Sequence, residues 1–147
     1  MTHSEQLRRQ HGFGTGNRIV VPKSGWNMVQ HHALFFGNVN GEAMVAENKE
    51  GHGVIFTRLD QFLAEAGRIT RVEPFLGTYQ QQAFIMDRVN ARFGRRYDEW
   101  NYNCEQFVND VLHGRVESRQ ADIGKVILGV VTVAAIGYGV AKLMGRR

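Results

Sequence analysis

The stretch Asn103-Cys104-Glu105-Gln106-Phe107-Val108 decides the fold and holds the only cysteine of the chain. A polar, aromatic loop at 97–103 precedes the cysteine and apolar residues at helical spacing follow it, so Cys104 is predicted at the start of an amphipathic helix. Unpaired N–H groups and partial positive charge at a helix start lower the pKa of a thiol. A single cysteine makes no internal disulfide or structural zinc site, so any special role is nucleophilic. The alternative of a small buried apolar residue stays open on the residues alone.

The composition predicts one domain of ordinary size with a tail. The chain has 147 residues, of which 43% are hydrophobic, and a net charge of +4. Its basic residues are scattered and match no nucleic-acid-binding motif, so no nucleic-acid partner is expected. The mild basic excess suits an anionic membrane surface equally well. One cysteine and no apolar run at the N-terminus argue against a secreted disulfide protein, so the thiol is expected in a reducing, cytoplasmic compartment.

The chain divides into a predicted flexible N-terminal segment (1–15), one folded domain (16–120) and a tail (121–147). Within the domain, β-branched and apolar runs predict strands at 18–22, 30–37, 42–48, 54–57 and 69–74. Apolar residues at helical spacing predict helices at 59–67, 78–93 and 104–113. An Asn-Gly pair predicts a hairpin turn at 38–41. Because most of the strands follow one another directly, the predicted class is α+β with an antiparallel sheet.

The tail contains 16 residues without a charge, 126–141. About 20 residues span the hydrocarbon of a bilayer, and the lysines that flank this run can reach the headgroups. We therefore predict a single C-terminal membrane-anchor helix with a basic end. The alternative is a buried core helix, which the lack of a polar face disfavours. Ala135 and Gly139 have the spacing of a helix–helix contact, so self-association through the tail is a further expectation.

A thiol nucleophile needs a base, and two of the six histidines lie in a strand of strong apolar character. These are His31 and His32, whose side chains are expected on opposite faces of the strand. Strand alternation alone does not choose between them. His113, at the far end of the cysteine helix, is explained by the favourable position of a cation there.

The segment 97–120, with its Asn103-Cys104-Glu105-Gln106-Phe107-Val108-Asn109 motif, resembles the cysteine motif of the lecithin:retinol acyltransferase family. Within that family the chain is most similar to the H-Ras-like suppressor phospholipase/acyltransferases, over about residues 16–144. The stretch His31-His32-Ala33-Leu34-Phe35-Phe36-Gly37 is similar to the family's histidine strand, and its glycine aligns the catalytic histidine with His31. Residues 16–20 are similar to the family's opening strand.

The chain departs from the family pattern at three places. Gln106 stands where the family usually has histidine, and 72 residues between His31 and Cys104 make the middle of the domain short. The third polar residue is not a histidine on the next strand; Glu47 and Asn48 are the candidates there. We prefer Glu47, whose carboxylate would accept a hydrogen bond from the His31 ring and favour its charged form. Asn48 would orient the ring without a charge.

The resemblance implies a permuted papain-like fold of the NlpC type, with an antiparallel sheet packed on the cysteine helix. It also implies a membrane-anchored thiol acyltransferase or phospholipase A, which acts on glycerophospholipids through an acyl-cysteine. The expected catalytic residues are Cys104, His31 and Glu47, with no metal or cofactor and with a phospholipid membrane as partner. A papain-like cysteine peptidase or amidase is the main alternative, because the same residues would serve it. A non-catalytic, membrane-associated regulator is the other.

The predicted anchor has a direct test. The full chain is expected to resist extraction from membranes by high salt or alkaline carbonate, whereas a chain that ends near Gln120 is expected in the soluble fraction. Burial of apolar surface contributes about 25 cal/mol per Å², which over a segment of this length is too much for reversible binding. Fractionation and immunoblotting measure the outcome. Recovery of the full chain in the soluble fraction would mean that the segment packs as a helix of the domain.

Overall fold

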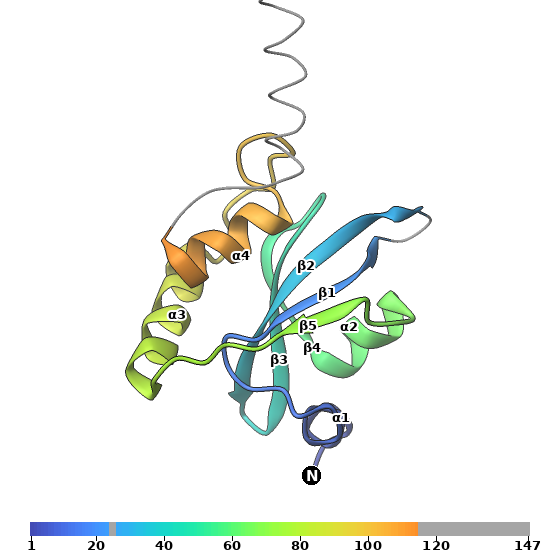
Figure 1. Ribbon diagram of the computed structural model, residues 1–147, viewed down its shortest axis with the longest axis vertical. Coiled ribbons are helices and arrows are strands. Elements are labelled where there is room, and N and C mark those ends of the chain that lie inside the picture. Colours follow the sequence, from blue (N-terminus) through green and yellow to red (C-terminus); the bar gives the residue numbers. More distant parts are fainter. Residues whose placement is uncertain (24–25, 115–147) are drawn as a thin grey trace, which may run out of the picture.

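A five-stranded antiparallel sheet forms the centre of the computed structural model, which describes residues 1–23 and 26–114 (Figure 1). The order across the sheet is β4-β3-β2-β1-β5, and every neighbouring pair is antiparallel. The predicted α+β class is therefore confirmed. The strands are β1 (Arg18–Lys23), β2 (Trp26–Val39), β3 (Glu42–Lys49), β4 (Gly53–Arg58) and β5 (Arg71–Glu73).

The predicted hairpin turn joins β2 to β3. Asn40 and Gly41 both have positive φ angles, 51° and 87°, as a tight two-residue hairpin turn requires. The β2 strand is longer than the sequence predicted, because it begins at Trp26 instead of residue 30. Its first part, up to Leu34, pairs with β1 and its last part, from Ala33, pairs with β3, so it is the central strand of the sheet.

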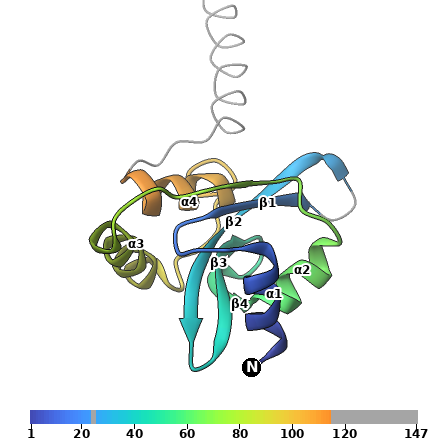
Figure 2. The ribbon, with the colours of Figure 1, turned by 60° about the horizontal axis from the view of Figure 1, so that its bottom comes forward.

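Helices cover both faces of the sheet (Figure 2). The helices α3 (Tyr79–Arg92) and α4 (Cys104–His113) pack on the face that carries Leu34 and Ala46. The opposite face, with Ala33 and Val45, packs against α2 (Leu59–Ala66) and the segment around Phe13. Successive residues of β2 and β3 therefore enter two different cores, as the alternation of side chains along a strand dictates.

Residues 1–15, for which the sequence predicts a flexible segment, contain the helix α1 (His3–His11). Thr2 is the N-cap, and its hydroxyl accepts a hydrogen bond from the N–H of Glu5 at 3.4 Å. Gly12 ends the helix with a φ of 71°, in the left-handed region that glycine adopts without strain. The sequence analysis did not predict this helix.

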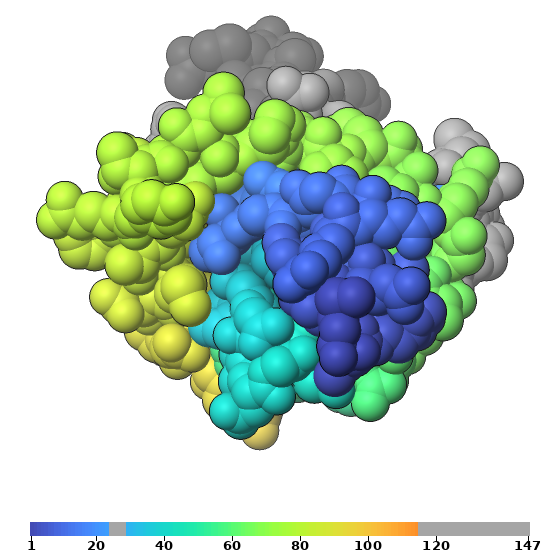
Figure 3. Space-filling model, turned by 90° about the horizontal axis from the view of Figure 1, so that it is seen from below, coloured from blue at the N-terminus to red at the C-terminus, as the bar shows by residue number. Residues whose placement is uncertain are grey.

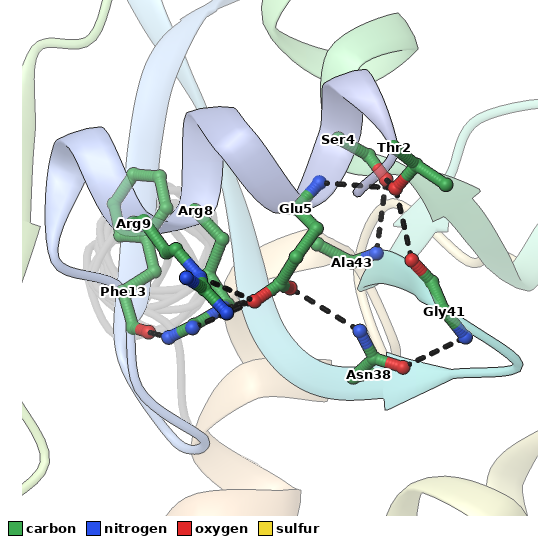
Figure 4. A network of polar contacts seen from close by, with 9 residues as sticks. All are labelled: Thr2, Ser4, Glu5, Arg8, Arg9, Phe13, Asn38, Gly41 and Ala43. Carbon is green, nitrogen blue, oxygen red and sulfur yellow. Dashed lines mark hydrogen bonds and ion pairs between the residues drawn. The ribbon is translucent and has the colours of Figure 1, made fainter.

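Polar contacts attach α1 to the β2–β3 hairpin (Figure 4). The buried hydroxyl of Ser4 accepts a hydrogen bond from the N–H of Ala43 at 3.0 Å and donates one to the carboxylate of Glu42. The Thr2 hydroxyl donates to the carbonyl of Gly41 at 2.9 Å. The space-filling view shows the blue N-terminal residues directly beside the cyan hairpin (Figure 3). These contacts, more than an apolar stripe, hold the helix against the sheet.

The strands β2 and β3 separate at the end of the sheet that carries the cysteine. They pair from Val39↔Glu42 to Ala33↔Glu47, after which β2 continues along β1 and β3 continues along β4. The loop before α4 lies at this point, because the side-chain amide of Asn48 donates to the carbonyl of Tyr102 at 2.6 Å and to that of Asn103 at 3.4 Å. The first residue of α4 is thereby held beside Gln30 and His31 of β2.

Within residues 1–23 and 26–114, no helix has both the length and the apolar character that a membrane crossing requires. The predicted anchor, 121–147, lies outside the described residues.

Candidate active site

The loop and cap before Cys104 fix the start of α4. Asn103 is the N-cap: its side chain accepts from the N–H of Gln106 at 3.0 Å, and its own N–H donates to the Gln106 side chain at 2.8 Å. The other end of the Gln106 amide donates to the carbonyl of Trp100 at 3.1 Å. Gln106 therefore belongs to the framework that holds Cys104 at the first helical position. Glutamine suits this cap because its amide both accepts and donates.

The Cys104 thiol lies 4.0 Å from the carbonyl oxygen of Gln30 on β2 and in hydrogen-bond contact with the ring of His31. The Nε2 atom of that ring lies 3.0 Å from Oε1 of Glu47. Nδ1 is thus the ring nitrogen left for the thiol. The structure brings together all three residues that the sequence analysis named as catalytic candidates; their catalytic roles remain predictions.

The pKa values of the cysteine and histidine are displaced toward an ion pair. Burial raises the pKa of the Cys104 thiol, but the contact with His31 outweighs it, and the backbone N–H groups of His32 and Glu105 lower it further, so that the net pKa lies below its ordinary value. Burial likewise disfavours the His31 cation, but the Cys104 and Glu47 contacts raise the pKa of that ring to about 9. The arrangement therefore favours a thiolate beside an imidazolium.

Glu47 lies in the interior as an anion. Its side chain is almost fully buried; burial raises the pKa of the carboxyl, while the hydrogen bond to His31 lowers it to a net value below normal. The other candidate, Asn48, faces the opposite side of the sheet, where it holds the loop before α4. Of the two, Glu47 is the residue in contact with the His31 ring.

His32 lies in a different environment from its neighbour. Its Nδ1 atom is 3.1 Å from a guanidinium nitrogen of Arg18, on the face covered by α4. Burial lowers the pKa of this ring to about 4, and the nearby Arg18 cation adds to the effect although Glu105 opposes it. His32 is therefore neutral and points away from Glu47, which makes it unsuitable as the base.

The sequence analysis did not identify Arg18 or Tyr97 as residues that lie around the cysteine. Arg18 is buried, forms an ion pair with Glu73 at 3.0 Å and donates to the side chain of Asn109 on α4. It joins β5, β2 and α4 behind the cysteine. The sequence signal that could have pointed to Arg18 is a charged residue at the start of an otherwise apolar strand.

Tyr97 lies near the thiol as a neutral phenol. Burial raises the pKa of Tyr97 to about 12, and the nearby Cys104 adds to this effect.

A pocket of about 500 Å³ borders His31 and Glu47 on the face that α2 covers. Within residues 1–23 and 26–114, no three His, Cys, Asp or Glu side chains are grouped to hold a metal ion.

A comparison with protein families matches residues 17–129 to the family described as "Permuted papain-like amidase enzyme, YaeF/YiiX, C92 family". The match supports the predicted permuted papain-like fold and a cysteine-type enzyme. It does not single out the lecithin:retinol acyltransferase family or its H-Ras-like suppressor members. It agrees better with the amidase alternative than with lipid acyl transfer. No curated protein and no solved structure was found to match the chain.

The displaced pKa values predict how the thiol reacts with pH. The alkylation rate of Cys104 by iodoacetamide is expected to stay high well below pH 8.5, because the thiolate is stabilised by the His31 imidazolium, which persists up to a pKa of about 9. Stopped-flow alkylation from pH 5 to 10 measures this profile. A rate that simply follows the titration of a free thiol near pH 8.5 would contradict the ion pair.

The two neighbouring histidines predict a matched pair of variants. His31→Ala is expected to slow alkylation at pH 6 by about 10- to 100-fold, because a thiol of ordinary pKa is only about 0.3% ionised there. His32→Ala is expected to slow it much less, because that ring lies with Arg18. The rates are compared after thermal melts establish that both variants fold. The reverse ranking would mean that the strand register is displaced by one residue.

Proposed function

Because the chain belongs to the permuted papain-like amidase family, we propose that it hydrolyses an amide bond through an acyl intermediate on Cys104. The observation that carries this proposal is the contact of one histidine with both the only thiol of the chain and a buried carboxylate. This arrangement supplies a nucleophile, a proton carrier and an orienting group.

In the first half of the reaction, the Cys104 thiolate attacks the carbonyl carbon, and the π electrons of the C=O bond move to its oxygen. The N–H of Cys104 lies at the first helical position, where helices leave donors without intrahelical partners, and is a suitable donor for this oxyanion. When the intermediate collapses, the C–N bond breaks and the leaving amine takes a proton from His31. The raised pKa keeps His31 protonated for this step up to about pH 9.

In the second half, water attacks the thioester while His31 takes its proton. The C–S bond then breaks, which releases the acid and restores the thiolate–imidazolium pair. Glu47 acts through His31: its hydrogen bond to Nε2 holds the ring with Nδ1 toward the thiol and favours the charged ring. Glu47→Gln is therefore expected to lower the rate less than loss of Cys104 or His31.

Acyl transfer from glycerophospholipids is the second candidate, favoured by the uncharged run 126–141 and the cysteine motif. The same residues would cleave an ester, with lyso-lipid as the leaving group. A membrane anchor would then hold the enzyme at the surface where its substrate lies, and so raise the effective substrate concentration.

One experiment separates the two candidates. The full chain is incubated with a panel of N-acyl aminomethylcoumarin amides and, in a second arm, with mixed phospholipid vesicles. Fluorescence measures amine release, and intact-protein mass spectrometry measures an acyl adduct on Cys104. We expect turnover of the amides and a loss of about 10²- to 10⁴-fold or more in Cys104→Ala.

An acyl adduct from the vesicles without amide turnover would favour the lipid candidate. Undiminished turnover by Cys104→Ala, with the domain still folded, would rule out both.

A further inference from the structure

The pocket beside His31 has an apolar floor. Val21 on β1 and Phe62 on α2 are almost fully buried beneath it, and Ala66 lines it from the last turn of α2. The rings of His31 and Phe62 lie 6.3 Å apart, so the floor reaches the histidine. A volume of about 500 Å³ lies within the range of about 300–1,000 Å³ that small-molecule sites occupy. The floor suits an apolar group that is attached close to the reacting atoms.

Two ion pairs form the rim of this pocket. Lys49 at the end of β3 pairs with Glu65 on α2 at 2.9 Å, and Lys23 at the end of β1 pairs with Glu50 at 2.5 Å. Both lysines of the lining are thus matched by glutamates, so the rim presents a balanced charge. Such a rim gives no strong attraction to a carboxylate, and at the inner end the negative charge of Glu47 is paired with the His31 cation.

The position of the pocket relative to the two reacting residues identifies which part of a substrate it faces. It borders His31 and Glu47, whereas Cys104 does not line it. In amide hydrolysis, the acyl half becomes attached to the cysteine, whereas the amine half receives the proton of the histidine. A group bonded to the leaving nitrogen therefore extends past the His31 ring. A second hollow of about 420 Å³, lined by Tyr97 and Arg96 among others, does not border His31.

The charges at the inner end of the pocket are balanced. Oε1 of the buried Glu47 carboxylate binds the His31 cation, and the side chain of Thr57 donates a hydrogen bond to the same carboxylate. The side of the histidine on which the pocket lies, and not its charge, therefore favours the amine half of the substrate over the acid product.

We propose that this pocket binds the amine half of the substrate, and that the substrate is an amide of an apolar primary amine, not of ammonia. The proposal rests on the proposed amidase function for its chemistry and on the pocket for its specificity. By microscopic reversibility, the same pocket binds the free amine after the C–N bond has broken. Binding of the amine is therefore measurable without turnover.

The first test measures binding of 2-phenylethylamine to the full chain by isothermal titration calorimetry, with phenylacetate as the probe of opposite charge. Ala66→Phe fills the pocket, and Ala64→Phe is the matched control because Ala64 is exposed on the same helix. We expect the amine to bind the wild type and Ala64→Phe alike, and to bind Ala66→Phe at least about tenfold more weakly. Phenylacetate is expected to bind the wild type more weakly than the amine does.

Equal binding of 2-phenylethylamine to the wild type and Ala66→Phe, or no binding to the wild type, would overturn the proposal. Thermal melts of the two alanine variants establish that both fold. If Ala66→Phe does not fold, Ala66→Leu makes the same comparison with a smaller side chain.

The second test measures specificity with two amides that share the acyl group of the best coumarin substrate. One is the primary amide and the other the 2-phenylethyl amide. We expect Ala66→Phe to lower the ratio of kcat/KM for the phenylethyl amide over the primary amide by about tenfold, and Ala64→Phe to leave it unchanged. An unchanged ratio in Ala66→Phe would overturn the proposal. Absence of turnover of both amides by the wild type would instead contradict the amidase function, and the binding measurement would still decide the role of the pocket.

Discussion

The separation of β2 from β3 is the constraint on which the candidate site depends. The cysteine helix packs on one face of the sheet, whereas His31 and Glu47 share the other face. A continuous sheet would keep the thiol and the imidazole apart. Because the strands part after Ala33↔Glu47, and Asn48 binds the loop before α4 there, Cys104 reaches the histidine past the end of their paired region.

The same geometry gives the two adjacent histidines different charge states, because the His31 ring is a cation and the His32 ring is neutral. His31 faces a carboxylate and a thiolate, which stabilise its cation, whereas burial disfavours the cation of His32 and the neighbouring Arg18 guanidinium adds to that effect. The two environments lie one residue apart along β2, on the two faces of one sheet. The electrostatic difference therefore follows from strand alternation, together with the placement of Glu47 and Arg18.

Sequence patterns predicted the antiparallel sheet, the helix at Cys104 and the three candidate residues, because these depend on apolar periodicity and one motif. They missed α1 because that helix has no broad apolar stripe as a signal, and polar contacts of Ser4 with the hairpin contribute to its docking. The role of Gln106 was likewise hidden from the sequence, because only the structure shows that its side-chain amide caps the start of α4. Tertiary contacts of single polar residues leave no periodic trace.

The contrast between the two histidines also bears on how the chain finds its register. A slip of β2 by one residue would exchange the two faces of the strand. It would place His31 against the Arg18 guanidinium and His32 near Glu47, while Leu34 and Phe35 exchanged cores. Apolar patterning alone penalises such a slip weakly here, because both faces of β2 are buried and hydrophobic. Because a histidine would again stand beside both Glu47 and Arg18, the charged groups do not select the register either, and the tight turn at Asn40-Gly41 is what fixes how β2 pairs with β3.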